Sequence, residues 1–159
     1  TLRRELMVNS SQKNTWTALV ALDRWPIRDS YIASIKAAAS NPSPHLLWEA
    51  GYRYREQVHR GPFGIFRPTF NLTVEEVDKE NYRIMWWARY LLTRGEHSWK
   101  VEKGETEDTS ILISEEIFRG PRAFLAIAIW LFHFFDVDGM TDKQLSFIAL
   151  DAEQIEKLN

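Results

Sequence analysis

The chain has 159 residues, no cysteine and a formal net charge of −2. This length fits one domain with a substantial buried core, and we expect residues 1–159 to form a single domain. The absence of cysteine excludes disulfides and thiol chemistry and favours a cytoplasmic location. Lys and Arg are spread along the chain, so no basic block indicates binding to nucleic acid or to an anionic membrane surface.

The first two thirds of the chain predict one helix among short strands. Asn9-Ser10-Ser11 supplies N-cap chemistry for a helix over residues 12–22, and Trp25-Pro26 is expected to end it. Alternation of apolar and polar residues, with short polar turns between the runs, indicates an antiparallel meander. The predicted strands cover residues 2–8, 31–38, 52–59, 69–77, 82–91, 96–102 and 110–118.

The C-terminal third is helical in pattern. Residues 123–135 are apolar nearly all round, and Pro121 suits the first turn of a helix. A run of this length is shorter than the roughly 20 residues that a membrane span needs, so we expect no stable membrane insertion. The run could instead be buried by the sheet, by a lipid surface or by a partner chain, as a homodimer face. Asp136–Gly139 interrupts it, and Thr141–Gln144 has the form of a capping box that begins another helix.

This order predicts an α+β fold. A curved antiparallel sheet of about six to seven strands would wrap around a long C-terminal helix, with short helices after the first strand. Because one helix cannot fill the whole concave side of such a sheet, we expect a cavity between the two. Polar side chains that face this cavity are the candidates for function.

Glu115 is the first candidate. By strand alternation it shares a face with Ile111, Ile113 and Ile117, and a carboxylate on an apolar face is costly unless it is paired, hydrogen-bonded or wet. Burial would raise the pKa of Glu115 and make it a general acid or base near neutral pH. A structural partnership with an Arg or Tyr is the alternative interpretation.

His97 and Glu56 are the other candidate catalytic residues. A histidine can exchange protons at neutral pH, and His97 would lie one strand from Glu115, so the two could form an acid–base couple. Packing of His97 beside Trp99 in the core is the alternative. Glu56 shares a face with the candidate tyrosines of its strand. The predicted substrate-binding residues are Tyr52, Tyr54, Tyr82, Trp86, Trp99, Phe124 and Leu131.

Metal and cofactor chemistry is disfavoured by the motifs. The four histidines show no metal-ligand spacing, and Asp136-x-Asp138-Gly139 lacks the remaining ligands of a calcium loop. No nucleophile elbow and no glycine-rich phosphate loop is present, so we expect no metal and no cofactor.

The order of these elements, with specific residues, resembles the START/Bet v 1-like helix-grip superfamily, also called SRPBCC or polyketide cyclase/dehydrase-like. The resemblance covers almost the whole chain. It is carried by the opening strand with its Asn9-Ser10-Ser11 cap, by Gly51 before the third strand, by His97-Ser98-Trp99, and by Glu115–Pro121. It implies a small stand-alone member with a hydrophobic cavity. Members bind lipids, hormones, polyketides and alkaloids; some are cyclases or dehydratases and many are carriers.

Three functions remain open at this point. The favoured one is a cofactor-free cyclase, dehydratase or isomerase acting on a hydrophobic, polyketide- or terpenoid-like intermediate of secondary metabolism. The second is a non-catalytic binding or transfer protein for a lipid or aromatic small molecule. The third is a protein-interaction module that uses the apolar run as a dimer face. Ionisable groups on apolar faces favour the enzyme, because such groups are costly in a passive lipid pocket.

Overall fold

The computed structural model describes residues 1–28, 32–45, 48–58, 69–90, 92–121, 124, 126 and 137–158. The elements in chain order are β1 (Leu2–Val8), α1 (Gln12–Val20), the 3₁₀ turn η1 (Leu22–Arg24), α2 (Trp25–Arg28), β2 (Ile32–Ala37), β3 (Arg53–Val58), β4 (Thr69–Asp78), β5 (Arg83–Tyr90), β6 (Thr93–Lys103), β7 (Ser110–Arg119) and α4 (Val137–Leu158). All seven predicted strands are present within a few residues of the expected bounds.

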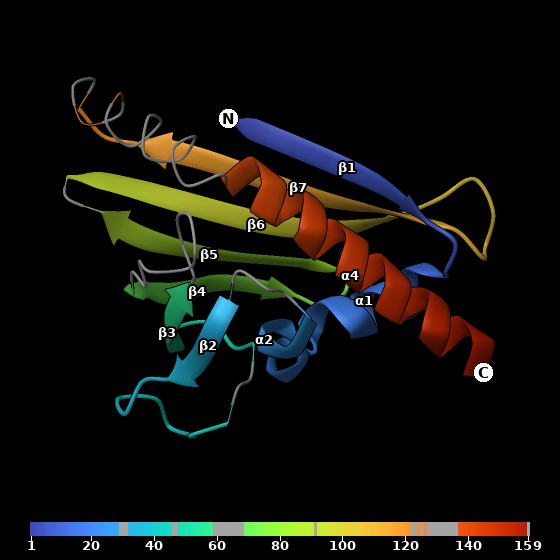
Figure 1. Cartoon of the computed structure of the whole chain (residues 1–159), viewed down its shortest axis with the longest axis horizontal. Coiled ribbons are helices and arrows are strands. Elements are labelled where there is room, and N and C mark those ends of the chain that lie inside the picture. Colours follow the sequence, from blue (N-terminus) through green and yellow to red (C-terminus); the bar gives the residue numbers. More distant parts are fainter. Residues whose placement is uncertain are drawn as a thin grey trace.

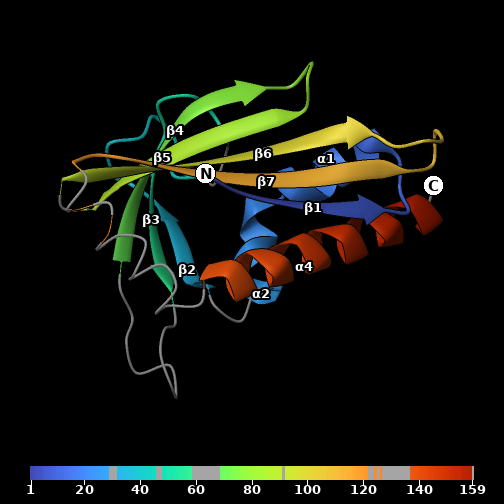
Figure 2. The same ribbon diagram turned by 90° about the horizontal axis from the view of Figure 1, so that it is seen from above.

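The strands form one antiparallel sheet in the order β1-β7-β6-β5-β4-β3-β2. Strands β2 to β7 follow one another as a meander, and β1 returns to pair with β7. The long helix α4 runs across the sheet (Figure 1). Seen from above, the sheet curves, and α1 and α4 lie on the same side of it (Figure 2). We call the sheet face toward α1 and α4 the inner face and the opposite face the outer face.

The core on the inner face is built around Trp25. Its side chain is 3% exposed, and its ring makes edge-to-face contacts with Trp48, Trp86, Trp99 and Phe147. Its indole Nε1–H donates a 3.1 Å hydrogen bond to the carbonyl oxygen of Leu19. This one side chain therefore ties the α1–α2 segment to the middle of the sheet and to α4.

Two helix boundaries differ from the sequence expectation. Trp25-Pro26 begins α2 instead of ending a helix; a proline in the first turn costs no hydrogen bond, because that N–H has no intrahelical acceptor. The capping box expected at Thr141 is also wrong, since α4 already begins at Val137 and Thr141 is a buried interior residue. Most of the apolar run 123–135 lies outside the described residues; Phe124 and Ala126 are helical.

Residues near the C-terminal end of α4 fasten it to the β1–α1 connection. One carboxylate oxygen of Glu156 accepts hydrogen bonds from Ser10 Oγ and Ser11 N at 2.9 Å and from Asn14 Nδ2 at 2.8 Å. As expected, Ser11 caps α1, accepting from the backbone N–H of Asn14. These donors favour the charged form and lower the pKa of Glu156 to about 2.

This anchor predicts an acid-dependent loss of stability. In the unfolded chain Glu156 protonates near pH 4, so its stabilising effect is complete above that range and is lost as pH falls toward the folded value of about 2. Glu156→Gln should therefore reduce the free energy of unfolding at pH 7, and its deficit against the wild type should shrink between pH 5 and pH 2. Urea unfolding at several pH values measures this. The exposed Glu105→Gln is the matched control, and a deficit that stays constant with pH would contradict the assignment.

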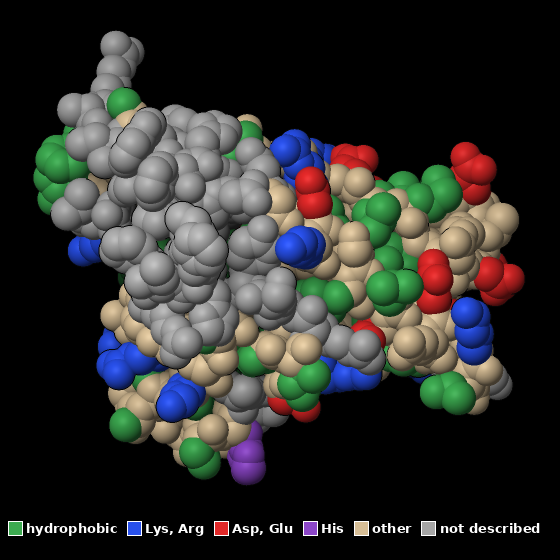
Figure 3. Space-filling view, viewed as in Figure 1, with side chains coloured by type: hydrophobic (Ala, Val, Ile, Leu, Met, Phe, Trp, Pro, Cys, Tyr) green, Lys and Arg blue, Asp and Glu red, His purple; other side chains and the backbone are tan. Residues whose placement is uncertain are grey.

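On the face that carries α4, side-chain charges are unevenly placed (Figure 3). Asp and Glu side chains predominate beside the β6–β7 turn and the end of α4, and Lys and Arg side chains lie over β2 and β3. No helix among the described residues combines the length and the apolar character that crossing a membrane requires.

Candidate functional site

The register of β6 with β7 decides which side chains face inward. Trp99 pairs with Ser114 and Val101 pairs with Leu112, and all four side chains are buried. Side chains at paired positions lie on the same face of an antiparallel sheet. The inner face of β7 therefore carries Ser114 and Glu116, the residue opposite His97.

Glu115 lies on the outer face, so the expectation that it faces the cavity is wrong. It pairs with Ser98 on one side and Arg3 on the other, and it lines an outer hollow together with Arg83, Arg94 and Arg119. The isoleucines that suggested an inward face point outward with it. Ile113 is nevertheless 6% exposed, because its neighbours across the strands are Glu5 and Lys100, whose aliphatic stems cover apolar surface.

His97 lies at the centre of a small polar cluster on the inner face. Its Nε2 is 2.8 Å from Ser114 Oγ, and its Nδ1 is 3.5 Å from a carboxylate oxygen of Glu116. Its ring packs between two indoles, with centroids 4.7 Å from Trp86 and 5.2 Å from Trp99. The histidine–carboxylate couple expected from the sequence is thus present in the fold, but with Glu116 in place of Glu115.

Burial keeps the His97 ring neutral. Removal from water disfavours the imidazolium and lowers the pKa of His97 to about 3. An ionised Glu116 only accepts hydrogen bonds, so it favours the tautomer with the proton on Nδ1. Nε2 then accepts from the Ser114 hydroxyl. At neutral pH His97 is therefore an uncharged group whose Nδ1 faces Glu116 and whose Nε2 faces Ser114.

A titration tests this protonation state. The NMR signals of the His97 ring should show no protonation step between pH 8 and pH 5, and proton uptake should begin only near pH 3. The same chain unfolded in urea provides the control, because its histidines titrate near pH 6.5. Since only the unfolded state takes up this proton between about pH 6.5 and 3, His97 should also lower native stability across that interval. A ring that titrates near pH 6.5 in the folded protein would contradict the burial argument.

His97 also lines an interior cavity between the inner face and the helices. The cavity measures about 40 Å³, which is room for about one water molecule. Its lining residues come from β2 to β6, the α1–α2 segment, the chain before β3, and α4: Leu22, Trp25, Ile35, Trp48, Tyr54, Glu56, Leu72, Trp86, His97, Met140 and Gln144. A larger molecule therefore requires this interior to open.

Two features of the cavity wall are suited to a ligand with an oxygen acceptor. Trp48 stacks on Trp86 at 5.1 Å, and these indoles form a flat apolar surface. The Trp48 Nε1–H is buried and has no hydrogen-bond acceptor within the described structure. A buried donor without an acceptor costs roughly 1–3 kcal/mol, so an oxygen atom placed against it would be stabilised. Glu56 adds a carboxylate to the same wall.

The other predicted residues divide between the cavity and its surroundings. Tyr54 and Trp86 line the cavity, while Trp99 is fully buried behind His97. Tyr52 is buried in the core beside Tyr54, and burial together with Glu49 raises its pKa.

Two further predicted residues, Tyr82 and Phe124, are not among those lining the cavity. Tyr82 precedes β5 in a left-handed conformation with φ 51° and packs edge-on against Trp16, at the α1 end of the core. Phe124 is half-buried in a helical turn. Leu131 lies outside the described residues.

Residues that sequence reasoning missed are Ser114, Glu116, Trp48 and Gln144. Glu116 was within reach, because Trp99 and Val101 were expected to point inward and their partners in a hairpin must share that face. Trp48 and Gln144 carry no such signal, because one precedes β3 outside any strand and the other belongs to a helix packed against distant strands. The described residues contain no group of three or more His, Cys, Asp or Glu side chains arranged to hold a metal ion.

Comparison with known proteins places the fold. No family model matches the chain, and no curated protein matches its sequence. Among solved structures, a norcoclaurine synthase from Thalictrum flavum superposes with a TM-score of 0.73 at 13% identity, over 96% of this chain and 93% of that one. A putative uncharacterised protein from Bacillus thuringiensis gives 0.62 at 17% identity, over 92% and 98% of the two chains.

The di-domain ARO/CYC protein StfQ from the steffimycin biosynthetic pathway gives a TM-score of 0.67 at 13% identity. The match covers 99% of this chain and 46% of StfQ, so this chain spans about half the length of that protein. Identities this low establish the fold alone. The chain shares the helix-grip fold of these structures, the fold that the resemblance read from the sequence implied.

Proposed function

We propose that this protein binds a flat, hydrophobic carbonyl compound between the sheet and α4 and catalyses a cofactor-free cyclisation, dehydration or isomerisation of it. The observation that carries the proposal is that a carboxylate, a neutral imidazole and an indole N–H without an acceptor (Glu56, His97 and Trp48) line one apolar cavity. Solved structures with this fold include a norcoclaurine synthase and ARO/CYC proteins of biosynthetic pathways, which is consistent with such chemistry.

The roles of the three groups follow from their chemistry. Glu56 removes a proton from the carbon next to the substrate carbonyl, the C–H electron pair moves into the enolate, and the proton stays on the carboxyl group. The Trp48 N–H donates to the carbonyl oxygen, where negative charge develops. His97 forms an uncharged part of the cavity wall, since both of its ring nitrogens face groups of β7. Return of the proton to another carbon gives isomerisation. Attack of the enolate on a second carbonyl closes a ring, and the new alkoxide takes the proton from Glu56. Dehydration follows when Glu56 removes a proton from the carbon next to the new hydroxyl and delivers it to the leaving oxygen, which departs as water.

The proposal treats residues 1–159 as one functional domain. Pairing of β1 with β7 joins the first and last strands, and α4 is fastened to the β1–α1 connection. The cavity wall combines groups from before β3, from β3 and from β6, so the proposed reaction requires that these segments be held together in one fold.

Enolisation of 1-phenylbutane-1,3-dione tests the proposal, because this diketone is flat, apolar and acidic between its carbonyls. The protein should bind it, with quenching of tryptophan fluorescence, and should accelerate exchange of its central protons for deuterium above the buffer rate. Binding without acceleration would overturn the catalytic proposal. Absence of binding to this and to related aromatic ketones would also count against the proposed cavity ligand.

A non-catalytic binding protein is the second candidate. The observation that favours it is that both ring nitrogens of His97 already face groups of β7, Ser114 and Glu116, so the imidazole can be wholly structural. Native mass spectrometry of the purified protein distinguishes the two. A carrier should retain a hydrophobic ligand unchanged through long incubation, whereas an enzyme should release product.

A further inference from the structure

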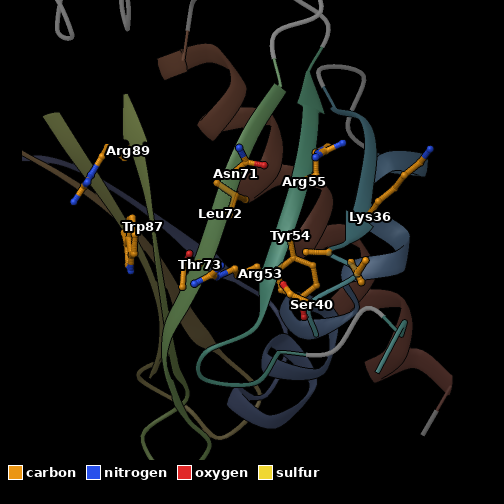
Figure 4. Close-up of a pocket in the computed structure, with 13 residues that line it drawn as sticks. Lys36, Ser40, Arg53, Tyr54, Arg55, Asn71, Leu72, Thr73, Trp87 and Arg89 are labelled. Carbon is orange, nitrogen blue, oxygen red and sulfur yellow. The ribbon is translucent and has the colours of Figure 1, made fainter. Parts of the chain in front are cut away.

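A second hollow, separate from the interior cavity, lies on the outer face across β2 to β5. It has a volume of about 720 Å³, within the range of small-molecule sites. Its lining includes four cationic side chains, Lys36, Arg53, Arg55 and Arg89, and contains no Asp or Glu. Figure 4 shows these cations distributed along neighbouring strands, with Asn71 and Thr73 between them. We call this hollow the outer cationic groove.

The strand register sets the cations close together. Lys36 on β2 pairs with Arg55 on β3, and Arg55 pairs in turn with Asn71 on β4. Arg53 lies two residues before Arg55 on the same face, about 7 Å along the strand, and pairs with Thr73. The backbone of Arg53 is held by Asn41, whose Oδ1 accepts from the Arg53 N–H and whose Nδ2 donates to the Arg53 carbonyl, both at 2.8 Å.

The groove cations differ from other arginines of the outer face, which form ion pairs with glutamates. Arg83 is paired with Glu76, Arg94 with Glu75 and Glu96, and Arg119 with Glu96. In the described structure none of the four groove cations has a carboxylate within ion-pair distance, although the whole chain carries 22 acidic and 20 basic residues. Four like charges left unpaired in one hollow repel one another, and a polyanion would relieve that repulsion.

The groove's other residues indicate a small ligand. Ala37, Ala38, Ala39 and Ser40 contribute only short side chains, so space remains between the longer cations, and Trp87 adds an aromatic wall at the β5 side (Figure 4). Arg94 stacks over the Trp87 ring at 4.8 Å and is itself ion-paired, so the unpaired positive charge ends there. A nucleic acid or an acidic protein would contact a longer cationic surface.

From this geometry we infer that the outer cationic groove binds a small molecule bearing a di- or triphosphate group. Guanidinium groups match phosphate oxygens with paired N–H donors, and Arg53 and Arg55 lie far enough apart along the strand to bind successive phosphates. Asn71, Thr73 and Ser40 supply further hydrogen bonds. The groove lies on the opposite face of the sheet from the interior cavity, so its ligand is distinct from the proposed carbonyl substrate.

Isothermal titration calorimetry with inorganic tripolyphosphate tests the inference at constant ionic strength. The wild type should bind, and Arg53→Gln combined with Arg55→Gln should weaken binding at least tenfold. The matched control is Arg3→Gln combined with Arg119→Gln, which also removes two outer-face charges but takes them from arginines already paired with glutamates. It should bind within about twofold of the wild type.

The thermal midpoint supplies an independent readout. Because the groove arginine side chains have no ion-pair partner among the described residues, their double replacement should leave the midpoint unchanged or raise it, so weakened binding would not reflect unfolding. Single replacement of Arg89 by Gln should also weaken binding. Three outcomes would overturn the inference. The wild type could fail to bind tripolyphosphate, or the control variant could lose as much affinity as the groove variant. The protein could also bind an acidic peptide or an oligonucleotide in place of tripolyphosphate.

Discussion

Replacing Trp25 with alanine should lower the free energy of unfolding by about 3–5 kcal/mol, the range for removing a large aromatic side chain from a core. Trp25 is 3% exposed, contacts four other rings and donates to the Leu19 carbonyl. The loss is therefore the sum of a cavity, four ring contacts and an acceptor left unsatisfied. Urea unfolding of the wild type and the variant measures it.

The matched control lies two residues away. Ile27 is 81% exposed, so Ile27→Ala should change the unfolding free energy by no more than about 0.5 kcal/mol. Trp25→Phe keeps one ring but loses the hydrogen bond, so its loss of unfolding free energy should lie between those of Trp25→Ala and Ile27→Ala. A small effect of Trp25→Ala, comparable with that of Ile27→Ala, would mean that the ring cluster does not organise the core.

Replacing Glu56 with glutamine should slow diketone enolisation at least about 100-fold, the lower end of what general base catalysis contributes. The amide is nearly the same size as the carboxylate but cannot take the proton. Binding of the diketone should change little, so kcat should fall while KM stays nearly constant. Stopped-flow absorbance on the enol band measures both parameters.

Two control variants separate chemistry from general damage. Glu115→Gln changes a carboxylate on the outer face and should leave the rate unchanged, because that group lies on the other side of the sheet from the cavity. Trp48→Phe removes the buried N–H and keeps an aromatic ring, so it should lower the rate without weakening the fold. Equal rates for Glu56→Gln and the wild type would remove Glu56 as the base.

The strand pattern was predictable because its physics is local. Alternation located all seven strands, and the polar cap at Ser11 located α1. The helix boundaries were harder to predict from the sequence. Thr141 matches a capping box in sequence, but α4 continues through it because the Thr141 side chain is buried against the rest of the protein, a tertiary effect that no local pattern contains.

The candidate site was predictable only where two strands were considered together. When β7 is considered alone, its isoleucines indicate the inward face, and Glu115 lies on that face. When β6 is considered as well, the turn that joins Lys103 to Ser110 fixes the pairing of the two strands, and Glu116 is then the inward carboxylate. Ile113 misled the prediction because it is buried on the outer face by neighbouring polar side chains. An apolar residue indicates burial but not which face of the sheet it lies on, and in this sheet residues are buried on both faces.

The outer cationic groove could not have been found from the sequence. Its four cations come from three strands, β2, β3 and β5, and in the sequence nothing distinguishes them from the paired arginines of the same face. Only the three-dimensional pairing shows which positive charges are neutralised and which are left for a ligand.

A crystal structure of the complex with 1-phenylbutane-1,3-dione tests the central claim most directly, because it shows where a flat carbonyl ligand binds. We predict that the diketone lies between the sheet and α4, with one oxygen accepting from the Trp48 N–H and its central carbon facing the Glu56 carboxylate. A diketone bound elsewhere, with the rings of Trp48 and Trp86 still stacked over a closed interior, would contradict the proposed function.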